Sequence, residues 1–119
     1  GGPGTAVGYA VLTLGRALET PPPLAADDSQ EAVLALKGAL ALLQRALGSL
    51  DAVQSILRIT VYVQSAPTFT QQSEVADGSS EVLFAVLGDA GAHTRTSVGV
   101  LQLPKNATVE VDLIASVRT

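Results

Sequence analysis

The chain has 119 residues, of which 47% are hydrophobic and 15% charged, with a formal net charge of −4 and no cysteine. The lack of cysteine excludes disulfides, thiolate catalysis and cysteine-based zinc sites. Lys and Arg number only seven and are scattered, beside two Tyr and two Phe. We expect no nucleic-acid partner, because phosphates need clustered positive charge and single strands need aromatic platforms.

The length fits a single domain spanning residues 1–119, with residues 1–4 interpreted as a tag remnant or a trimmed start. The charged fraction is below the roughly 25% that is typical of soluble domains, so we expect a partner to cover part of the surface. Lys37 and Gln44 interrupt the longest apolar stretch, and the N-terminus lacks a basic segment followed by an apolar one. We therefore expect no membrane partner and a cytoplasmic protein.

The first element is predicted to be a strand from Ala6 to Leu14, because these residues are mostly apolar or β-branched. Gly15 and Arg16 follow, where we expect the chain to turn sharply. Three consecutive prolines at 21–23 cannot continue a sheet and predict an extended loop.

A helix is predicted next. Asp28 and Glu31 have the spacing of a capping box, with Asp in the place of the usual Ser or Thr. Apolar residues then recur at intervals of three and four, as on one face of a helix that should end at Gly48. That face comprises Val33, Leu36, Leu40, Leu43 and Leu47.

A second strand and a second helix follow. Residues Ile56 to Gln64 alternate strictly, which predicts a strand with Leu57, Ile59, Val61 and Val63 on its apolar side and Arg58, Thr60, Tyr62 and Gln64 on its polar side. Ser79 to Leu87 predicts a helix with Ser79 or Ser80 as its cap and Gly88 as its end.

Two further strands, Thr94 to Leu103 and Thr108 to Val117, are predicted to form a hairpin at 104–106 (Pro-Lys-Asn). In the last strand one face is apolar, and Glu110 and Asp112 point away from it. The order β, α, β, α, β, β predicts an α+β fold in which two helices pack on one face of a single mixed sheet. The other face then meets water or another subunit.

The predicted hairpin places the guanidinium of Arg95 near the carboxylate of Glu110. An arginine holds a carboxylate with two parallel hydrogen bonds at any working pH, and a positioned carboxylate orients a water molecule or takes its proton. This pair predicts a site that binds and hydrolyses a small carboxylate. His93 is expected to be a loop residue, and as the single histidine it is taken to exclude a catalytic triad or a two-histidine metal site.

Several segments together resemble the Rid/YjgF family of reactive-intermediate imine deaminases, also known as endoribonucleases L-PSP. They are 48–53 (GSLDAV), 59–63 (ITVYV), 95–100 (RTSVGV) and 103–111 (LPKNATVEV). Segments 65–70 (SAPTFT), 77–80 (DGSS) and 88–91 (GDAG) most resemble the YjgF-endoribonuclease-like branch.

The resemblance implies a chorismate-mutase-like fold, a homotrimer with clefts between subunits, and no cofactor or metal. It also implies that Arg95 clamps a substrate carboxylate together with the backbone N–H of Ser97. Glu110 would orient the attacking water, and the carbonyl of Gly15 would receive the imine nitrogen. The implied ligand is a small carboxylate such as 2-aminoacrylate.

The chain departs from the family pattern around Gly15. The segment 14–16 reads Leu-Gly-Arg where Ser-Gly-Gln is usual, so only the glycine is retained, and Ser97 stands where a cysteine is common. Two functions therefore stay open: an imine or enamine hydrolase, and a trimeric module that binds a small carboxylate without turnover. A ribonuclease is disfavoured by the acidic charge and the few aromatic residues.

Overall fold

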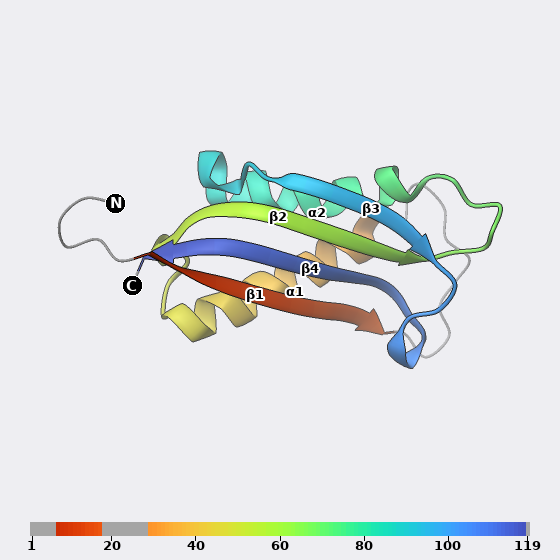
Figure 1. The fold of residues 1–119 in the computed structure, drawn as a ribbon, viewed down its shortest axis with the longest axis horizontal. Helices are drawn as coiled ribbons and strands as arrows, with labels where there is room; N and C mark the ends of the chain where they lie inside the picture. The colour runs from red at the N-terminus through yellow and green to blue at the C-terminus, as the bar shows by residue number, and fades with distance from the viewer. Residues whose placement is uncertain (1–6, 18–28, 119) are drawn as a thin grey trace.

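The computed structural model describes residues 7–17 and 29–118 (Figure 1). Within them the chain forms four strands and two long helices, joined in part by short 3-10 turns. The strands are β1 (Val7–Ala17), β2 (Val53–Gln64), β3 (Thr94–Val100) and β4 (Ala107–Arg118); the helices are α1 (Ser29–Leu47) and α2 (Gln72–Leu87); the turns are η2 (Leu50–Ala52), η3 (Gly88–Gly91) and η4 (Pro104–Asn106).

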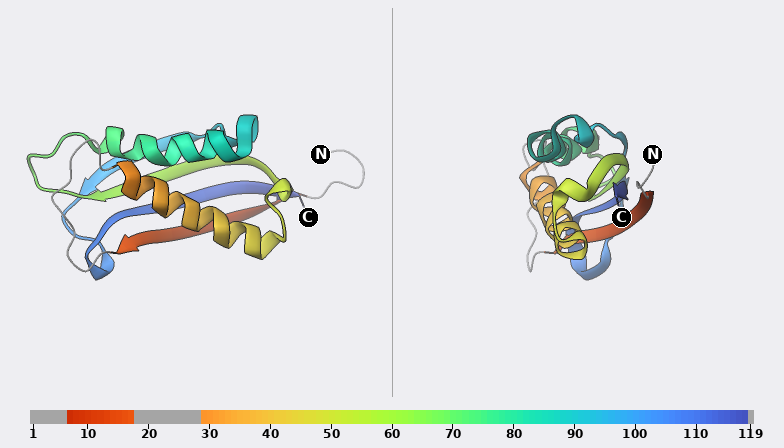
Figure 2. Two further views of the ribbon diagram at one scale, coloured as in Figure 1. Left: turned by 180° about the vertical axis from the view of Figure 1, so that it is seen from behind. Right: turned by 90° about the vertical axis from the view of Figure 1, so that its left-hand side faces the viewer.

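The four strands form one mixed sheet in the order β1-β4-β2-β3. β4 is antiparallel to both β1 and β2, whereas β3 runs parallel to β2. Both helices cover the same face of the sheet, and the other face is left open (Figure 2). The predicted element order and the α+β class with helices on one face are confirmed.

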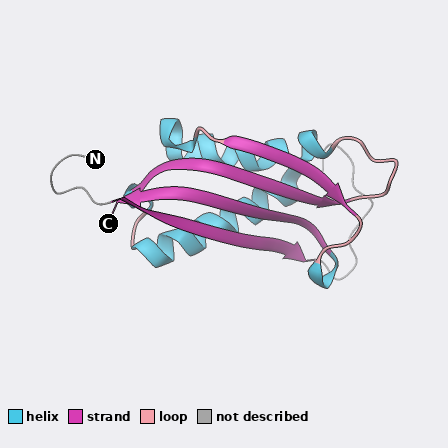
Figure 3. Cartoon of the chain, in the orientation of Figure 1, coloured by secondary structure: helices cyan, strands magenta, loops and turns pink. Residues whose placement is uncertain are grey.

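The predicted hairpin between the last two strands is wrong, because β2 lies between β3 and β4 (Figure 3). The segment β2-α2-β3 is a parallel crossover unit, which places β3 at the edge of the sheet beside β2. β4 instead pairs on both sides and is buried along most of its length. Lys105 and Asn106, each at φ 56°, form the left-handed turn that leads into β4.

The core lies between the helices and the covered face of the sheet. The predicted apolar sides of the central strands are confirmed, because Ile59 and Val61 of β2 and Val109 and Val111 of β4 are fully buried. Leu36, Leu40 and Leu43 of α1 pack into the same cluster, and α1 ends as predicted at Gly48, whose φ is 85°. Among the described residues, no helix is long and apolar enough to cross a bilayer.

Two details of the strands differ from expectation. β1 does not turn at Gly15 but continues to Ala17, with a break in register only at its last residue. In β2 an irregularity in the pairing with β4 falls between Ile56 and Arg58. It buries Ile56 and leaves Leu57 42% exposed, the reverse of a strict alternation. The predicted proline loop and Asp28 lie outside the described residues.

The second helix begins at Gln72, seven residues before the predicted start. Ser79 is therefore not a cap but lies inside the helix, where it donates a 2.8 Å hydrogen bond to the carbonyl of Ala32 in α1. Gly78 lies where the backbone of α1 passes so close that a Cβ would overlap the carbonyl of Ser29. Gly78 and Ser79 thus do not start the helix but pack α2 against α1. The predicted end at Gly88, with φ 57°, is confirmed.

Candidate functional site

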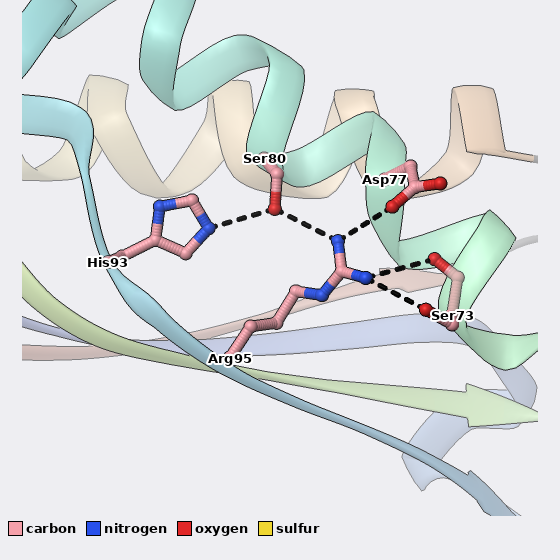
Figure 4. Close-up of polar contacts among 5 residues, drawn as sticks. All are labelled: Ser73, Asp77, Ser80, His93 and Arg95. Carbon is pink, nitrogen blue, oxygen red and sulfur yellow. Dashed lines mark hydrogen bonds and ion pairs between the residues drawn. The ribbon is translucent and has the colours of Figure 1, made fainter.

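Arg95 lies on the edge strand β3 and extends its side chain toward α2 (Figure 4). Its Nη1 donates to the Oδ1 of Asp77 at 2.9 Å and to the Oγ of Ser80 at 3.0 Å. Its Nη2 donates to the Oγ of Ser73 at 2.9 Å and to the carbonyl of the same residue at 3.4 Å. The guanidinium is thus held by one face of a single helix.

His93 joins the same group of polar side chains from the loop before β3. Its Nδ1 is 2.6 Å from the carbonyl of Gly91, which can only accept, so Nδ1 carries the proton. In the neutral ring Nε2 then accepts from the hydroxyl of Ser80 at 2.8 Å. The exposed ring of Phe84 lies 5.6 Å from the imidazole, centroid to centroid.

We call Ser73, Asp77, Ser80, His93 and Arg95 the arginine cluster. The loop position predicted for His93 is confirmed, and its hydrogen bond to Ser80 is a contact that the sequence did not predict. Sequence reasoning missed the three α2 residues because it started the helix too late. The available signal was the spacing 73, 77, 80, which places one residue on each successive turn of the same helix face.

Glu110 lies on the opposite face of the sheet from Arg95. Arg95 is in register with Ile59, which is fully buried under the helices. Glu110 is in register with Tyr62 and lies between the buried Val109 and Val111, so its side chain points to the open face. The expectation that one chain brings this guanidinium near this carboxylate is therefore wrong.

The separation within the sheet is also large. Along β2, the partners of Arg95 and Glu110 are Ile59 and Tyr62, three residues apart, and the two strands are second neighbours. Strand rise and spacing then place the two Cα atoms about 14 Å apart. A substrate with three or four carbons does not span this distance through a sheet.

The expected site residues instead form two groups. Ser97 follows Arg95 on β3 at the strand period of two, so both side chains belong to the same face. Gly15 of β1 is directly opposite Glu110 of β4, which places its backbone next to that residue. We call the first pair the arginine half-site and the second pair the glutamate half-site.

The open face next to Glu110 carries one strong polar contact. The hydroxyl of Tyr62 donates to the Oδ2 of Asp112 at 3.0 Å. This bond, followed by partial burial and the nearby carboxylate charge, raises the pKa of Tyr62 above its usual 10.0. The tyrosine therefore remains a neutral hydrogen-bonding group beside the glutamate half-site.

A cavity of about 300 Å³ lies past the end of the arginine half-site, where β2 and β3 meet the start of α2. Its lining includes Ser65, Phe69, Gln72, Gly99 and Leu101. A Cβ at Gly99 would lie 2.7 Å from the Nε2 of Gln72 and 2.8 Å from the Oγ of Ser65. Among the described residues no group of three or more His, Asp or Glu could hold a metal ion.

Comparisons with known proteins agree with this fold. A family model described as endoribonuclease L-PSP matches residues 13–117. The chain is 48% identical over 73 residues to the protein TCP17 of Trypanosoma cruzi. That match covers 60% of this chain and 46% of TCP17, so the chain spans less than half of this curated relative.

Among solved structures, the protein Atu1372 from Agrobacterium tumefaciens superposes with a TM-score of 0.82 at 29% identity, covering 93% of this chain and 76% of that one. RidA from the Antarctic bacterium Psychrobacter gives 0.51 at 25% identity, covering 73% and 62%. Rv2704 of Mycobacterium tuberculosis, a YjgF/YER057c/UK114 family member, shares the fold with a TM-score of 0.56 at 19% identity, covering 92% and 79%. The chain therefore belongs to the endoribonuclease L-PSP family, which is the Rid/YjgF family.

Proposed function

We propose that this protein is a metal-free hydrolytic deaminase of small imine and enamine carboxylates such as 2-aminoacrylate. Its site is formed between subunits of a homotrimer, with the arginine half-site from one subunit and the glutamate half-site from the next. The observation that carries the proposal is the register of Gly15 opposite Glu110 on adjacent strands. This register places the carbonyl of Gly15, which would receive the imine nitrogen, next to Glu110, which would orient the water.

The chemistry of the two half-sites is complementary. Arg95 binds the substrate carboxylate with charge-assisted hydrogen bonds, and the backbone N–H of Ser97 assists it. The carbonyl of Gly15 accepts a hydrogen bond from the protonated imine nitrogen. Glu110 orients a water molecule for attack on the C=N carbon and takes one of its protons.

The bond changes balance without a cofactor. An enamine such as 2-aminoacrylate first takes a proton from water at its methylene carbon, which gives the protonated imine. The water oxygen then forms a bond to the imine carbon, and the nitrogen takes up the electron pair of the C=N π bond. The resulting carbinolamine loses ammonia as Glu110 returns its proton to the leaving nitrogen. The hydroxyl then collapses to a carbonyl, and its proton passes to Glu110 and from there to solvent. The products are a 2-oxo acid and ammonia.

The open face of the sheet supports a subunit interface. It carries Tyr62, Glu110 and Asp112, polar side chains that suit a hydrated interface better than a core. A subunit that covered this face with its own edge strand would bring its arginine to the glutamate half-site. Within one chain the two half-sites lie on opposite faces of the sheet and cannot meet. Between two chains they can meet, because a surface of one subunit can contact a different surface of the next.

The test follows 2-oxo acid release from freshly generated 2-aminoacrylate and 2-iminobutyrate. We expect the wild-type protein to accelerate release, and Arg95→Ala and Glu110→Gln to lose the acceleration while sedimenting as the same oligomer. Glu81→Gln, an exposed carboxylate change on α2, is the matched control and should keep full activity. Equal rates with wild type and Arg95→Ala would refute the proposal.

Two observations favour a second candidate, a trimeric module that binds a small carboxylate without turnover. The guanidinium of Arg95 is already paired with Asp77 in the single chain, and Leu-Gly-Arg replaces the usual Ser-Gly-Gln around Gly15 of the glutamate half-site. This candidate predicts a rise in melting temperature with 2-oxobutyrate that requires Arg95, with no acceleration of 2-oxo acid release. Turnover that requires Arg95 would exclude it.

A further inference from the structure

Asp77 occupies the position on Arg95 that a ligand carboxylate would need. The two terminal nitrogens of an arginine carry four of its five N–H groups. In the arginine cluster these nitrogens make four hydrogen bonds, to Asp77, Ser80 and twice to Ser73. No pair of parallel N–H groups on the terminal nitrogens is open to a second carboxylate.

We propose that a ligand carboxylate binds Arg95 by displacing Asp77, and that Asp77 thereby restricts the site to monocarboxylates. This inference rests on the proposed function, which assigns carboxylate binding to Arg95. The hydroxyl of Ser73 stays in place and becomes a further ligand contact, since it can rotate to donate to the incoming carboxylate. The hydroxyl of Ser80 keeps its hydrogen bonds to Arg95 and His93.

Asp77 is the partner that can leave most readily. Its side chain is 57% exposed, and a single oxygen contacts the guanidinium, whose own side chain is 21% exposed. Ion pairs at exposed positions contribute little to stability. Ser80 is held from its other side by His93, and the carbonyl of Ser73 belongs to the helix backbone. Exchange of one carboxylate for another leaves the charge on Arg95 balanced.

The charges on α2 then select among ligands. The first two turns of the helix carry Glu74 and Asp77, and the helix contains no Lys or Arg. Once displaced, Asp77 stays on the same turn of the helix, within the distance at which like charges repel. A ligand with one carboxylate replaces the ion pair between Arg95 and Asp77. A second carboxylate on the ligand would be repelled by the acidic side chains of this helix, which offers no cation to bind it.

The test measures dissociation constants by titration calorimetry for 2-oxobutyrate, a stable monocarboxylate, and 2-oxoglutarate, which adds a second carboxylate to the same head group. We expect Asp77→Asn to lower the dissociation constant of 2-oxobutyrate by about two- to fivefold, the range given by the free energy of an exposed ion pair. The dissociation constant of 2-oxoglutarate should fall by a larger factor, because the variant also removes repulsion of the second carboxylate.

Glu81→Gln makes the same charge change at an exposed position of the same helix, four residues further on, and is the control. It should shift 2-oxobutyrate affinity by less than about twofold, because screening weakens charges beyond the contact distance. The inference is overturned if Asp77→Asn binds 2-oxobutyrate no tighter than the wild type or Glu81→Gln, or if neither the wild type nor Asp77→Asn binds it.

Arg95→Lys separates this inference from the proposed function. A lysine keeps the charge but lacks the planar fork that bonds Ser73 and Ser80 while the N–H released by Asp77 faces the ligand. If Arg95→Lys binds 2-oxobutyrate as the wild type does, the proposed carboxylate clamp fails. If it loses binding and Asp77→Asn shows no gain, the clamp holds and only the displacement of Asp77 is wrong.

Discussion

Replacing Ser80 by alanine should destabilise the protein through two lost hydrogen bonds. Ser80 accepts from the guanidinium of Arg95 at 3.0 Å and shares a 2.8 Å bond with His93, and both contacts are partly buried. A bond to a charged group contributes about 1.5–3 kcal/mol and a neutral one about 0.5–1.5 kcal/mol. Because water can reach both partners in part, we expect a loss near the lower sum, about 2 kcal/mol.

Ser73→Ala is the matched control, because it also removes a hydroxyl that Arg95 contacts. Ser73 is exposed, and its carbonyl still accepts from Arg95, so we expect a loss of about 0.5 kcal/mol. Urea unfolding at one protein concentration measures both, and Ser80→Ala should lower the midpoint by about 1 M with an unchanged slope. If Ser80→Ala costs no more than Ser73→Ala, the arginine cluster is not a connected network.

Three further predictions concern the fold and the open face. Gly78→Ala should destabilise the protein by about 1–3 kcal/mol in urea unfolding, despite the better helix propensity of alanine, because its Cβ overlaps the backbone of Ser29; an increase in stability would contradict the helix crossing. The raised pKa of Tyr62 means that its contribution to stability is complete below pH 10 and is lost as the pH rises through the folded-state pKa. Tyr62→Phe should therefore be less stable than the wild type at neutral pH and lose less stability on moving to alkaline pH; parallel pH profiles would refute this. Gly99→Ala should change stability by less than about 1 kcal/mol, because the Cβ meets flexible ends of Gln72 and Ser65, and a large loss would show that these side chains cannot move.

The sequence predicts elements well where burial is one-sided. The alternation in β2 and β4 and the three-and-four spacing in α1 identify their buried faces, since each element packs one face on a shared core. The start of α2 was missed because Gly78 and Ser79 are weak helix formers locally. They are placed in a helix by contacts with Ser29 and Ala32, which lie far away in the sequence.

The candidate site is predicted only in part, because its arrangement also depends on contacts between residues that are far apart in the sequence. Alternation assigns Glu110 to the polar side of its strand, but it does not specify which strands are neighbours. The separation of Arg95 from Glu110 follows from the position of β2 between β3 and β4, a property of topology. Asp77 and Ser80 reach Arg95 from a helix whose predicted start was too late, so the spacing 73, 77, 80 was not read as one helix face.

A mixed-trimer measurement tests the central claim, that the site joins residues of two subunits. Arg95→Ala and Glu110→Gln chains with different affinity tags are expressed together, and assemblies that contain both are purified. In any such trimer, one cleft of the three unites an intact arginine half-site with an intact glutamate half-site. The account predicts inactive pure variants and about one third of wild-type 2-oxo acid release from the mixed assembly. An inactive mixed trimer would contradict it.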